Sequence, residues 1–356
     1  MYALHKPMKG LFQHEDILSL EPLLNELKNK KLFITGGTGY VGKCLLDLLL
    51  RANQILNLNL KINLLTRNQG KFLKDFPLAL ETKNINFIEQ DINEGLDNLL
   101  IEDLDFVIHA ATAASSQERI SLLKEPAEKL LKNTINNTKN IISLCKRKTN
   151  TKCLYISSGA VYDKIKNSEK LRENDYSLED LYAADESDVY TLGKILSEKV
   201  FHEARDKDGF INFNIARCFS FIGPYLPIDS NLVGSNFFYN IVSKEPITIQ
   251  GHGSETRSFM HSYDLAIWLI NILMKGHASE TYNVGSDKEI TISEFAKKIS
   301  QHFQNYEICI KKLNTNTSRR QYYIPDLSKA KEELNLNFKY ENIEQCIANT
   351  AKWYEL

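Results

Sequence analysis

A tyrosine and a lysine four residues apart are the pair in this sequence best suited to acid–base chemistry. Tyr190 and Lys194 lie in a stretch, 186–207, whose pattern predicts a helix, so both would lie on one face, one turn apart. A lysine ammonium beside a phenol lowers the phenol pKa because it favours the phenolate. Such a tyrosine can take a proton from an alcohol while hydride leaves the carbon, or return one to a ketone. Ser158, at the end of the preceding predicted strand, could hydrogen-bond the same oxygen.

The Tyr-x-x-x-Lys spacing alone is weak support for this chemistry. It occurs three times, at Tyr2/Lys6, Tyr162/Lys166 and Tyr190/Lys194. The first pair is near the terminus, where chains are often disordered. The second lies in a polar loop directly after a strand, where helical spacing has no meaning. Only the third lies on a convincing helix that follows a strand ending in serine.

A glycine-rich turn is the second candidate site. Residues 32–35 have the pattern of a short apolar strand, and Gly36, Gly39 and Gly42 follow it at the start of a predicted helix. This order directs backbone N–H groups and the positive end of a helix dipole at a phosphate. The three glycines would serve the turn, the approach of a pyrophosphate and the packing of helix on strand. The turn predicts a dinucleotide site, with Thr38, Tyr40 and Val41 as further candidate contacts.

The end of the second predicted strand, 60–66, bears on the choice of dinucleotide. A carboxylate at this place would bond the ribose 2′-hydroxyl of NAD. The sequence has Thr66 and then Arg67, which lack that carboxylate and add a cation suited to a 2′-phosphate. We therefore expect NAD(P), with NADP slightly favoured. The alternative is that Arg67 is a solvated loop residue.

Two more predicted strands, 85–90 and 105–110, end beside further candidate contacts. A side chain after the first could meet an adenine ring. Small residues after the second would let the backbone approach a cofactor closely, although they would also suit an ordinary loop. The candidates are Asp91, Ile92, Ala110 and Ala111 for the cofactor, and Ser115 for the substrate.

The elements that must position these residues alternate between strand and helix. Further strands are predicted at 152–157 and 211–217, with helices at 126–147 and 186–207 between them. This alternation predicts an α/β fold with a doubly wound, parallel, Rossmann-type sheet and a site at the carboxyl ends of its strands.

Glycine and proline cluster at 223–234 and 246–253, which indicates a change to a smaller C-terminal α/β unit. The expected parts are an N-terminal extension (1–30), a cofactor domain (31–218 and 258–275) and a substrate domain (219–257 and 276–356). Leucines at helical spacing predict a short helix over 17–27 within the extension.

The composition excludes several classes of function. The chain has 356 residues, with 44 Lys and Arg against 45 Asp and Glu, so no basic field is present to hold nucleic acid. No apolar run is long enough to span a bilayer, and the first residues lack the pattern of a secretory signal. The six cysteines contain no Cys-x-x-Cys pair and lie mostly in apolar runs, as buried thiols would in a reducing compartment. We expect a cytoplasmic protein with no membrane or nucleic-acid partner, and no metal site.

In several motifs the sequence resembles the extended short-chain dehydrogenase/reductase superfamily, in its NAD-dependent nucleotide-sugar epimerase/dehydratase branch. The matching segments keep the order and spacing of that family from about residue 31 to residue 340. They are 35–42, 91–92, 107–111, 157–162, Tyr190 with Lys194, 216–219, 223–224, 257–266 and 282–285.

The resemblance implies a Rossmann-type cofactor domain and a smaller domain that holds a nucleoside-diphosphate sugar. It implies Tyr190 as the acid/base, Lys194 as its electrostatic partner and ribose ligand, and Ser158 as a hydrogen-bond partner. Arg257 resembles the residue that grips the diphosphate, and Asn236 the amide just before a helix that does likewise. A homodimer through the helices at 126–147 and 186–207, and a setting in polysaccharide biosynthesis, are further expectations of the family.

Two departures from the family pattern affect the expected reaction and the expected substrate. The 4,6-dehydratases carry an Asp-Glu pair directly after the position of Ser158, whereas this sequence has Gly159 and Ala160, which have no proton to move. Ser220 stands where many epimerases have a phosphate-binding asparagine, which leaves the nucleotide open. We expect hydride transfer at a sugar carbon, with C4 favoured, by an epimerase. The alternatives are an NADPH-dependent 4-keto-sugar reductase, then a dehydratase that uses other residues, or a non-catalytic NAD(P) sensor.

Overall fold

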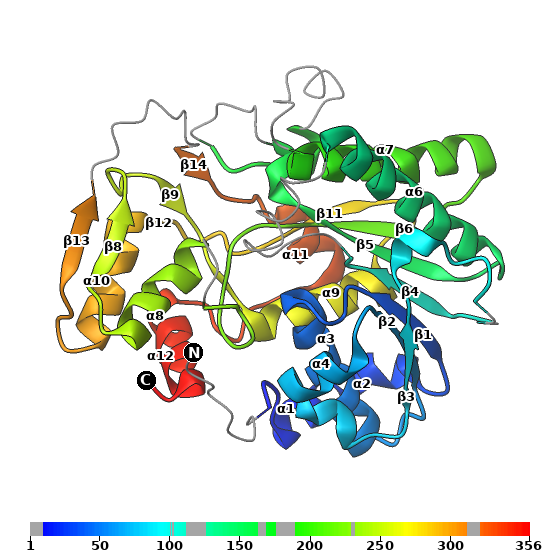
Figure 1. The fold of residues 1–356 in the computed structure, drawn as a ribbon, viewed down its shortest axis with the longest axis horizontal. Helices are drawn as coiled ribbons and strands as arrows, with labels where there is room; N and C mark the ends of the chain where they lie inside the picture. Colours follow the sequence, from blue (N-terminus) through cyan, green and yellow to red (C-terminus); the bar gives the residue numbers. More distant parts are fainter. Residues whose placement is uncertain are drawn as a thin grey trace.

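The computed structural model describes residues 10–99, 101, 103–111, 126–162, 169–175, 189–228, 232–311 and 321–356. Its main feature is a seven-stranded sheet in which neighbouring strands run parallel (Figure 1). In spatial order its strands are β11 (Thr281–Val284), β6 (Phe213–Cys218), β5 (Lys152–Ser158), β4 (Phe106–His109), β1 (Lys31–Thr35), β2 (Lys61–Thr66) and β3 (Ile85–Glu89). The doubly wound parallel sheet predicted from the sequence is confirmed.

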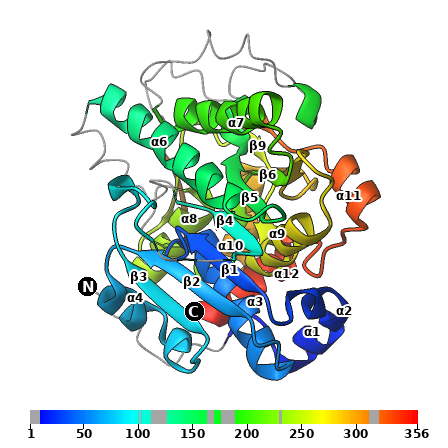
Figure 2. The same ribbon diagram turned by 90° about the vertical axis from the view of Figure 1, so that its right-hand side faces the viewer.

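Side chains of each strand alternate between two helical layers, as the pleat of a strand requires. Leu154 and Ile156 of β5 belong to the core on the side of α3 and α9. Cys153 and Tyr155 belong to the core on the side of α6 and α7, which lie together against one face of the sheet (Figure 2). The helices are α3 (Tyr40–Ile55), α6 (Ala127–Lys146), α7 (Val189–Asp208) and α9 (Ser262–Lys275).

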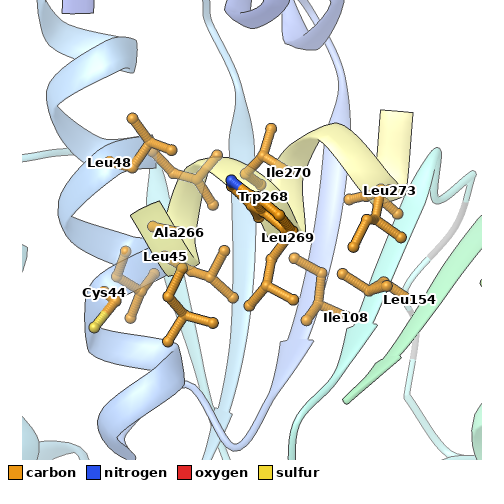
Figure 3. Packing of buried hydrophobic residues seen from close by; sticks show 14 of the residues in the cluster. Cys44, Leu45, Leu48, Ile108, Leu154, Ala266, Trp268, Leu269, Ile270 and Leu273 are labelled. Atoms are coloured by element: carbon orange, nitrogen blue, oxygen red, sulfur yellow. The ribbon is translucent and has the colours of Figure 1, made fainter. Parts of the chain in front are cut away.

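Helix α9 is buried on nearly all sides because it lies between the sheet, α3 and α11 (Ser328–Leu334). Leu269 and Trp268 are fully buried in the packing between α3 and the strands (Figure 3). Burying one leucine side chain contributes roughly 1.5–3 kcal/mol. Because α3 begins at the glycine turn, this core also fixes the position of the turn relative to β4 and β5.

A second hydrophobic core lies beside the sheet, on the left of Figure 1. It is formed by α8 (Val233–Ser243), β8 (Ile247–Gln250), α10 (Ile292–His302), β13 (Ile308–Lys311) and α12 (Ile343–Tyr354). Short strands connect it to the sheet: β7 (Phe221–Ile222) with β10 (Met260–His261), and β9 (Thr256–Arg257) between β12 (Ile290–Thr291) and β14 (Tyr322–Tyr323). A smaller α/β unit after the sixth strand agrees with the expectation from the sequence.

One boundary of the expected domains is corrected by strand pairing. Residues 276–356 were assigned to the substrate domain, but β11 pairs in parallel with β6, from Thr281 with Ile215 to Val284 with Cys218. The strand therefore belongs to the large sheet. All four residues of β11 are buried, as expected for a strand that is covered on both faces.

The N-terminal extension packs against helix α3. The expected single helix over 17–27 is instead α1 (His14–Ser19), α2 (Glu21–Leu24) and a 3₁₀ turn, η1 (Asn25–Leu27). Pro22 lies in the first turn of α2, where a missing N–H is tolerated, and this explains the break after Ser19. The extension packs on α3, where backbone N–H groups of Leu11 and Phe12 donate to Asp47.

The other predicted strands and helices are present with ends shifted by a few residues. Short elements complete the order: α4 (Gln69–Asp75), η2 (Pro77–Leu80), η3 (Ile92–Glu94), η4 (Gly159–Tyr162) and η5 (Glu173–Asp175). Among the described residues, none of the helices has the length and apolar character required to cross a membrane.

Candidate active site

The glycine turn joins β1 to α3 with little room for side chains. Gly36 has φ +70°, and a Cβ there would lie 2.4 Å from the carbonyl of Ala110. A Cβ on Gly42 would lie 2.3 Å from the Cα of Gly37. Gly39 is the N-cap of α3 and has no capping side chain, and the first turn of α3 has no acidic residue. The positive end of this helix is therefore suited to an anion.

The turn meets the end of β4 at the point where the strand order changes direction. The N–H of Ala110 donates to the Thr35 carbonyl at 3.1 Å, and that of Ala111 to Thr35 Oγ1 at 3.3 Å. Thr35 Oγ1 also shares a 2.8 Å hydrogen bond with Nδ1 of His109. Burial lowers the pKa of His109 to about 3, so its ring is neutral. In open α/β sheets, ligands bind at this kind of switch point.

Helix α7 brings Lys194 against the end of β5. Lys194 is buried, and its Nζ donates to the Ile156 carbonyl at 2.6 Å. Nζ also lies 5.9 Å from the ring centre of Tyr190 and 4.9 Å from that of Tyr155. Burial lowers the pKa of Lys194 to about 8, partly opposed by Cys218 and Glu198. An ammonium in this place can stabilise a phenolate on Tyr190.

Ser158 is the last residue of β5, two positions after the carbonyl that Lys194 contacts. It is buried, and its Oγ accepts the N–H of Ala160 at 3.1 Å. Tyr190 is half-buried in the first turn of α7, which packs on β5 and η4. The structure thus brings the helix with Tyr190 and Lys194 to the strand that ends in Ser158.

Space at Gly159 is filled by a tyrosine from the second unit. A Cβ on Gly159 would lie 2.4 Å from the hydroxyl oxygen of Tyr323, and 3.0 Å from Phe219. The Tyr323 ring packs on Phe219 with 4.7 Å between ring centres. An acidic side chain at position 159 would therefore have to displace a packed aromatic ring.

Arg257 lies next to this tyrosine, because Tyr323 and Arg257 are partners in the pairing of β14 with β9. The Arg257 guanidinium carbon is 5.8 Å from the Tyr323 ring centre, and Nη1 donates to the Thr256 carbonyl at 2.8 Å. Arg257 is half-buried. Arg257, the cation expected to bind a diphosphate, therefore lies beside the Tyr323 ring, and the hydroxyl of that ring lies at Gly159, the residue after β5.

The position of Asn236 differs from the expectation that it precedes a helix. Helix α8 begins at Val233, and the N–H of Asn236 donates to the Leu232 carbonyl at 2.8 Å. Asn236 is therefore inside the first turn of the helix. Ser115, the other expected substrate contact, lies outside the described residues.

Comparison with known proteins identifies the family. A model of the NAD dependent epimerase/dehydratase family matches residues 32–285, more than half of the chain. The chain belongs to the NAD dependent epimerase/dehydratase family. It is 28% identical over 310 residues to UDP-glucuronic acid decarboxylase 1 of Arabidopsis thaliana, covering 86% of this chain and 66% of that protein.

Solved structures with the same fold include other members of the epimerase/dehydratase family. The epimerase of Methanothermobacter thermautotrophicus has a TM-score of 0.77 at 20% identity, covering 94% of both chains. UDP-glucuronic acid 4-epimerase of Bacillus cereus, solved with UDP-glucuronic acid and NAD, has a TM-score of 0.72 at 20% identity, covering 91% of this chain and 99% of the other. The family and the proteins it resembles are nucleotide-sugar enzymes, and the chain is an enzyme of this family.

The glycine turn fits the dinucleotide of an NAD-dependent family. Gly36 and Gly42 hold the close backbone contacts that a Cβ would prevent, and Gly39 leaves the N-terminus of α3 uncapped. The residues that would hold the cofactor are those of the turn, together with Ala110 and Ala111, which the structure brings against it.

The predicted adenosine contacts lie at the ends of β2 and β3. Thr66 is buried and its Oγ1 accepts the N–H of Asn68 at 3.2 Å, while Arg67 is exposed. Asp91 caps η3, which starts at Ile92, by accepting the N–H of Asn93 at 2.8 Å. These residues border one edge of the sheet, and their roles toward a cofactor stay predictions.

A buried ion pair beside the site was not predicted from the sequence. Arg217 of β6 and Glu198 of α7 are both buried and joined at 2.7 Å. Two signals in the sequence could have revealed it. Arg217 interrupts an otherwise buried strand, and a buried guanidinium needs a partner; Glu198 follows Lys194 by four residues, on the same helical face.

Proposed function

We propose that this protein is an NAD(P)-dependent enzyme that acts on a nucleoside-diphosphate hexose by hydride transfer at C4, as a 4-epimerase. The observation that supports this most is the placement of Tyr190 and Lys194 on α7, with the Lys194 Nζ 2.6 Å from a carbonyl of the strand that ends in Ser158. An alcohol oxidation needs a base at the oxygen and a hydride acceptor at the carbon. In this proposal α7 and β5 supply the base, and the glycine turn binds the hydride acceptor.

In this proposal Tyr190 takes the proton of the C4 hydroxyl and later returns it to the C4 ketone. Lys194 stabilises the phenolate form of Tyr190, and Ser158 donates a hydrogen bond to the same sugar oxygen. The glycine turn would hold the nicotinamide cofactor, which would supply the hydride acceptor, and later the hydride donor, at C4. Inversion follows when the keto sugar turns over between the two transfers, so no net oxidant is consumed.

Dehydration is disfavoured by the residues after Ser158. Gly159 and Ala160 carry no acid or base, and the Tyr323 hydroxyl occupies the space that a side chain at position 159 would need. Loss of water from C6 and C5 requires a group that protonates the leaving hydroxyl and another that removes the C5 proton. This part of the structure therefore supports redox chemistry without elimination.

Decarboxylation of a nucleoside-diphosphate uronic acid is the second candidate. Curated relatives of this chain include UDP-glucuronic acid decarboxylases. Oxidation at C4 places a ketone β to the C6 carboxylate. Carbon dioxide can then leave from C5, with the electron pair moving to the C4 oxygen. This step needs no acid at position 159, so the same Tyr190, Lys194 and Ser158 would serve it.

Several finer assignments follow from the proposal. Arg257, Asn236 and Ser115 would contact the nucleotide sugar, with Arg257 on the diphosphate. Arg67 would favour NADP, and with it the alternative of a 4-keto-sugar reductase. The protein would act as a homodimer in polysaccharide biosynthesis in the cytoplasm.

The test is to incubate purified protein with UDP-glucose, UDP-N-acetylglucosamine and UDP-glucuronic acid, and to analyse products by NMR and mass spectrometry. A C4 epimer of unchanged mass supports the epimerase. Loss of carbon dioxide identifies a decarboxylase, and loss of water identifies a dehydratase. Consumption of NADPH when a nucleoside-diphosphate 4-keto sugar is supplied as substrate identifies a reductase. Tyr190→Phe should reduce turnover at least roughly 100-fold while the cofactor still binds, whereas the exposed Tyr239→Phe should not. Full turnover by Tyr190→Phe would contradict the assigned role.

A further inference from the structure

The buried ion pair between Glu198 and Arg217 lies where α7 crosses β5 and β6. The two side chains are 2% and 4% exposed. Arg217 Nε donates to both carboxylate oxygens at 3.1 and 3.2 Å, and Nη2 donates to Oε2 at 2.7 Å. A guanidinium and a carboxylate in this forked arrangement fix each other in distance and orientation. The pair therefore fixes α7 against β6.

The same carboxylate reaches the strand that ends in Ser158. Ser157 Oγ donates a hydrogen bond to Glu198 Oε1. Ser157 is also the partner of Arg217 in the parallel pairing of β5 with β6. Because Ser157 is bonded directly to Ser158, any shift of Glu198 along the strand would move the peptide that carries Ser158.

Helix α7 carries the candidate catalytic residues in the same stripe as Glu198. Tyr190, Lys194 and Glu198 are spaced by four residues, so they lie about one turn, or roughly 6 Å, apart along one face. Lys194 contacts the Ile156 carbonyl, and Glu198 contacts Ser157. Two polar contacts on successive turns thus set the position of α7 along β5, and Tyr190 occupies the next turn.

Arg217 extends this arrangement to the segment after Ser158. Its Nη1 donates to the Tyr162 hydroxyl at 2.8 Å and to the Glu173 carbonyl at 2.9 Å. The Tyr162 hydroxyl in turn donates to Asn283 of β11 at 2.8 Å. One guanidinium therefore connects α7 and β6 with η4, η5 and β11.

We propose that Glu198 and Arg217 are positioning residues that hold Tyr190 and Lys194 in register with Ser158. Stability alone is a poor reason for this pair, because buried ion pairs can often be replaced by apolar side chains without loss of stability. The directed contacts to Ser157 and Tyr162 instead specify one docking of α7 on the strand ends. The catalytic consequence of this inference rests on the proposed function.

The experiment compares four variants with the wild-type protein. Ser157→Ala removes one contact and leaves the ion pair intact. Glu198→Gln removes the carboxylate charge that pairs with the buried Arg217, and the double variant E198Q/R217Q removes both charges of the pair if the single variant does not fold. Thr138→Val is the matched control, because the buried Thr138 hydroxyl of α6 donates to Ser197 Oγ and so connects α7 to α6.

Two measurements are made on each variant that folds. Hydrogen–deuterium exchange of the segment 189–194 reports how firmly the start of α7 is held. The kcat and KM for the nucleotide sugar, with the dissociation constant for the cofactor, report catalysis. We expect faster exchange at 189–194 and a lower kcat in S157A and E198Q/R217Q, by up to roughly 100-fold in the double variant, with cofactor affinity changed far less.

The two readouts separate the failure of this inference from the failure of the proposed function. Unchanged exchange at 189–194 in S157A and E198Q/R217Q, or an equal increase in T138V, overturns the positioning role. If wild-type protein turns over no nucleotide sugar, the proposed function fails, while the exchange comparison still decides whether the ion pair holds the start of α7.

Discussion

At the scale of single residues, Lys194 is expected to set the pH range of the enzyme. Burial lowers its pKa from 10.5 to about 8. As pH rises through about 8 the ammonium loses its proton, and the support for the Tyr190 phenolate weakens, so kcat should fall on the alkaline side. The folded state releases this proton at lower pH than the unfolded state. Between about pH 8 and 10.5 the unfolded state therefore binds more protons, and the free energy of unfolding should rise with pH.

The measurement is kcat against pH, with the free energy of unfolding over the same range. Lys194→Met should remove most of the activity and the rise in stability above pH 8. Lys199→Met is the control, because Lys199 is exposed on the same helix and should leave both profiles unchanged. A wild-type profile that stays flat to pH 10 would exclude Lys194 as the group that supports Tyr190.

Arg67 is the residue that should decide between the two nicotinamide dinucleotides. It is exposed at the end of β2, where a 2′-phosphate could add one charged hydrogen bond worth about 1.5 kcal/mol. Arg67→Ala should weaken binding of NADPH roughly tenfold and leave that of NADH unchanged, as measured by titration of nicotinamide fluorescence. Lys71→Ala, an exposed cation on α4, is the control. Equal losses for both dinucleotides would make Arg67 an ordinary loop residue.

Residue types and spacing identified the local parts of the site but not its long-range partners. The glycine turn and the Tyr190–Lys194 spacing depend on neighbours in sequence, so periodicity could find them. Tyr323 meets Gly159 across 164 positions (323 − 159), through the pairing of short strands that no local pattern predicts. Asn236 was expected before a helix but lies in its first turn. The start of α8 at Val233 has no capping side chain, so the sequence does not indicate where the helix begins.

At the scale of elements, the N-terminal extension is anchored by one buried carboxylate. Asp47 of α3 accepts the N–H groups of Leu11 and Phe12, ion-pairs with Arg51 at 2.9 Å, and accepts the hydroxyl of Tyr225 from the second unit. Its side chain is fully buried. A charge that satisfies four donors from separate segments holds the extension, α3 and the start of the second unit together.

Asp47→Ala should therefore destabilise the protein by about 3–5 kcal/mol, because it leaves Arg51 and three other donors without their acceptor. The free energy of unfolding in urea measures this loss. Asp208→Ala is the control: Asp208 pairs with Lys146 at 2.6 Å on the surface, and its loss should cost less than about 1 kcal/mol. Similar losses in both variants would show that the extension is not held by this carboxylate.

Element types were predicted better than element ends and assignments. Strands with apolar residues on both faces, such as β5 and β6, stand out because a sheet covered by two helical layers needs them. Strand β11 was assigned to the substrate domain and not to the large sheet, because its partner in that sheet, β6, is distant in sequence. The expected helix over 17–27 was divided because Pro22 fits only in a first turn.

At the scale of the whole molecule, the outer face of α6 and α7 is the surface expected to join two copies of the chain. The two helices lie side by side on one face of the sheet, with their other side away from it (Figure 2). Half-buried apolar side chains on these helices include Leu131, Ile135, Leu192 and Leu196. Pairing of this face with its symmetry copy would bury these side chains in a four-helix contact, and a stable interface buries about 1,200–2,000 Å².

We expect light scattering of the wild-type protein to give the mass of a dimer, and Leu196→Glu to give that of a monomer. The reason is that two symmetry-related carboxylates would lose water at the contact without a partner. Leu80→Glu is the control, because Leu80 is 65% exposed in η2, away from these helices. Since α7 also carries Tyr190 and Lys194, the monomeric variant should show faster hydrogen exchange at 189–194. A wild-type monomer would contradict the dimer, and a dimer that survives Leu196→Glu would place the interface elsewhere.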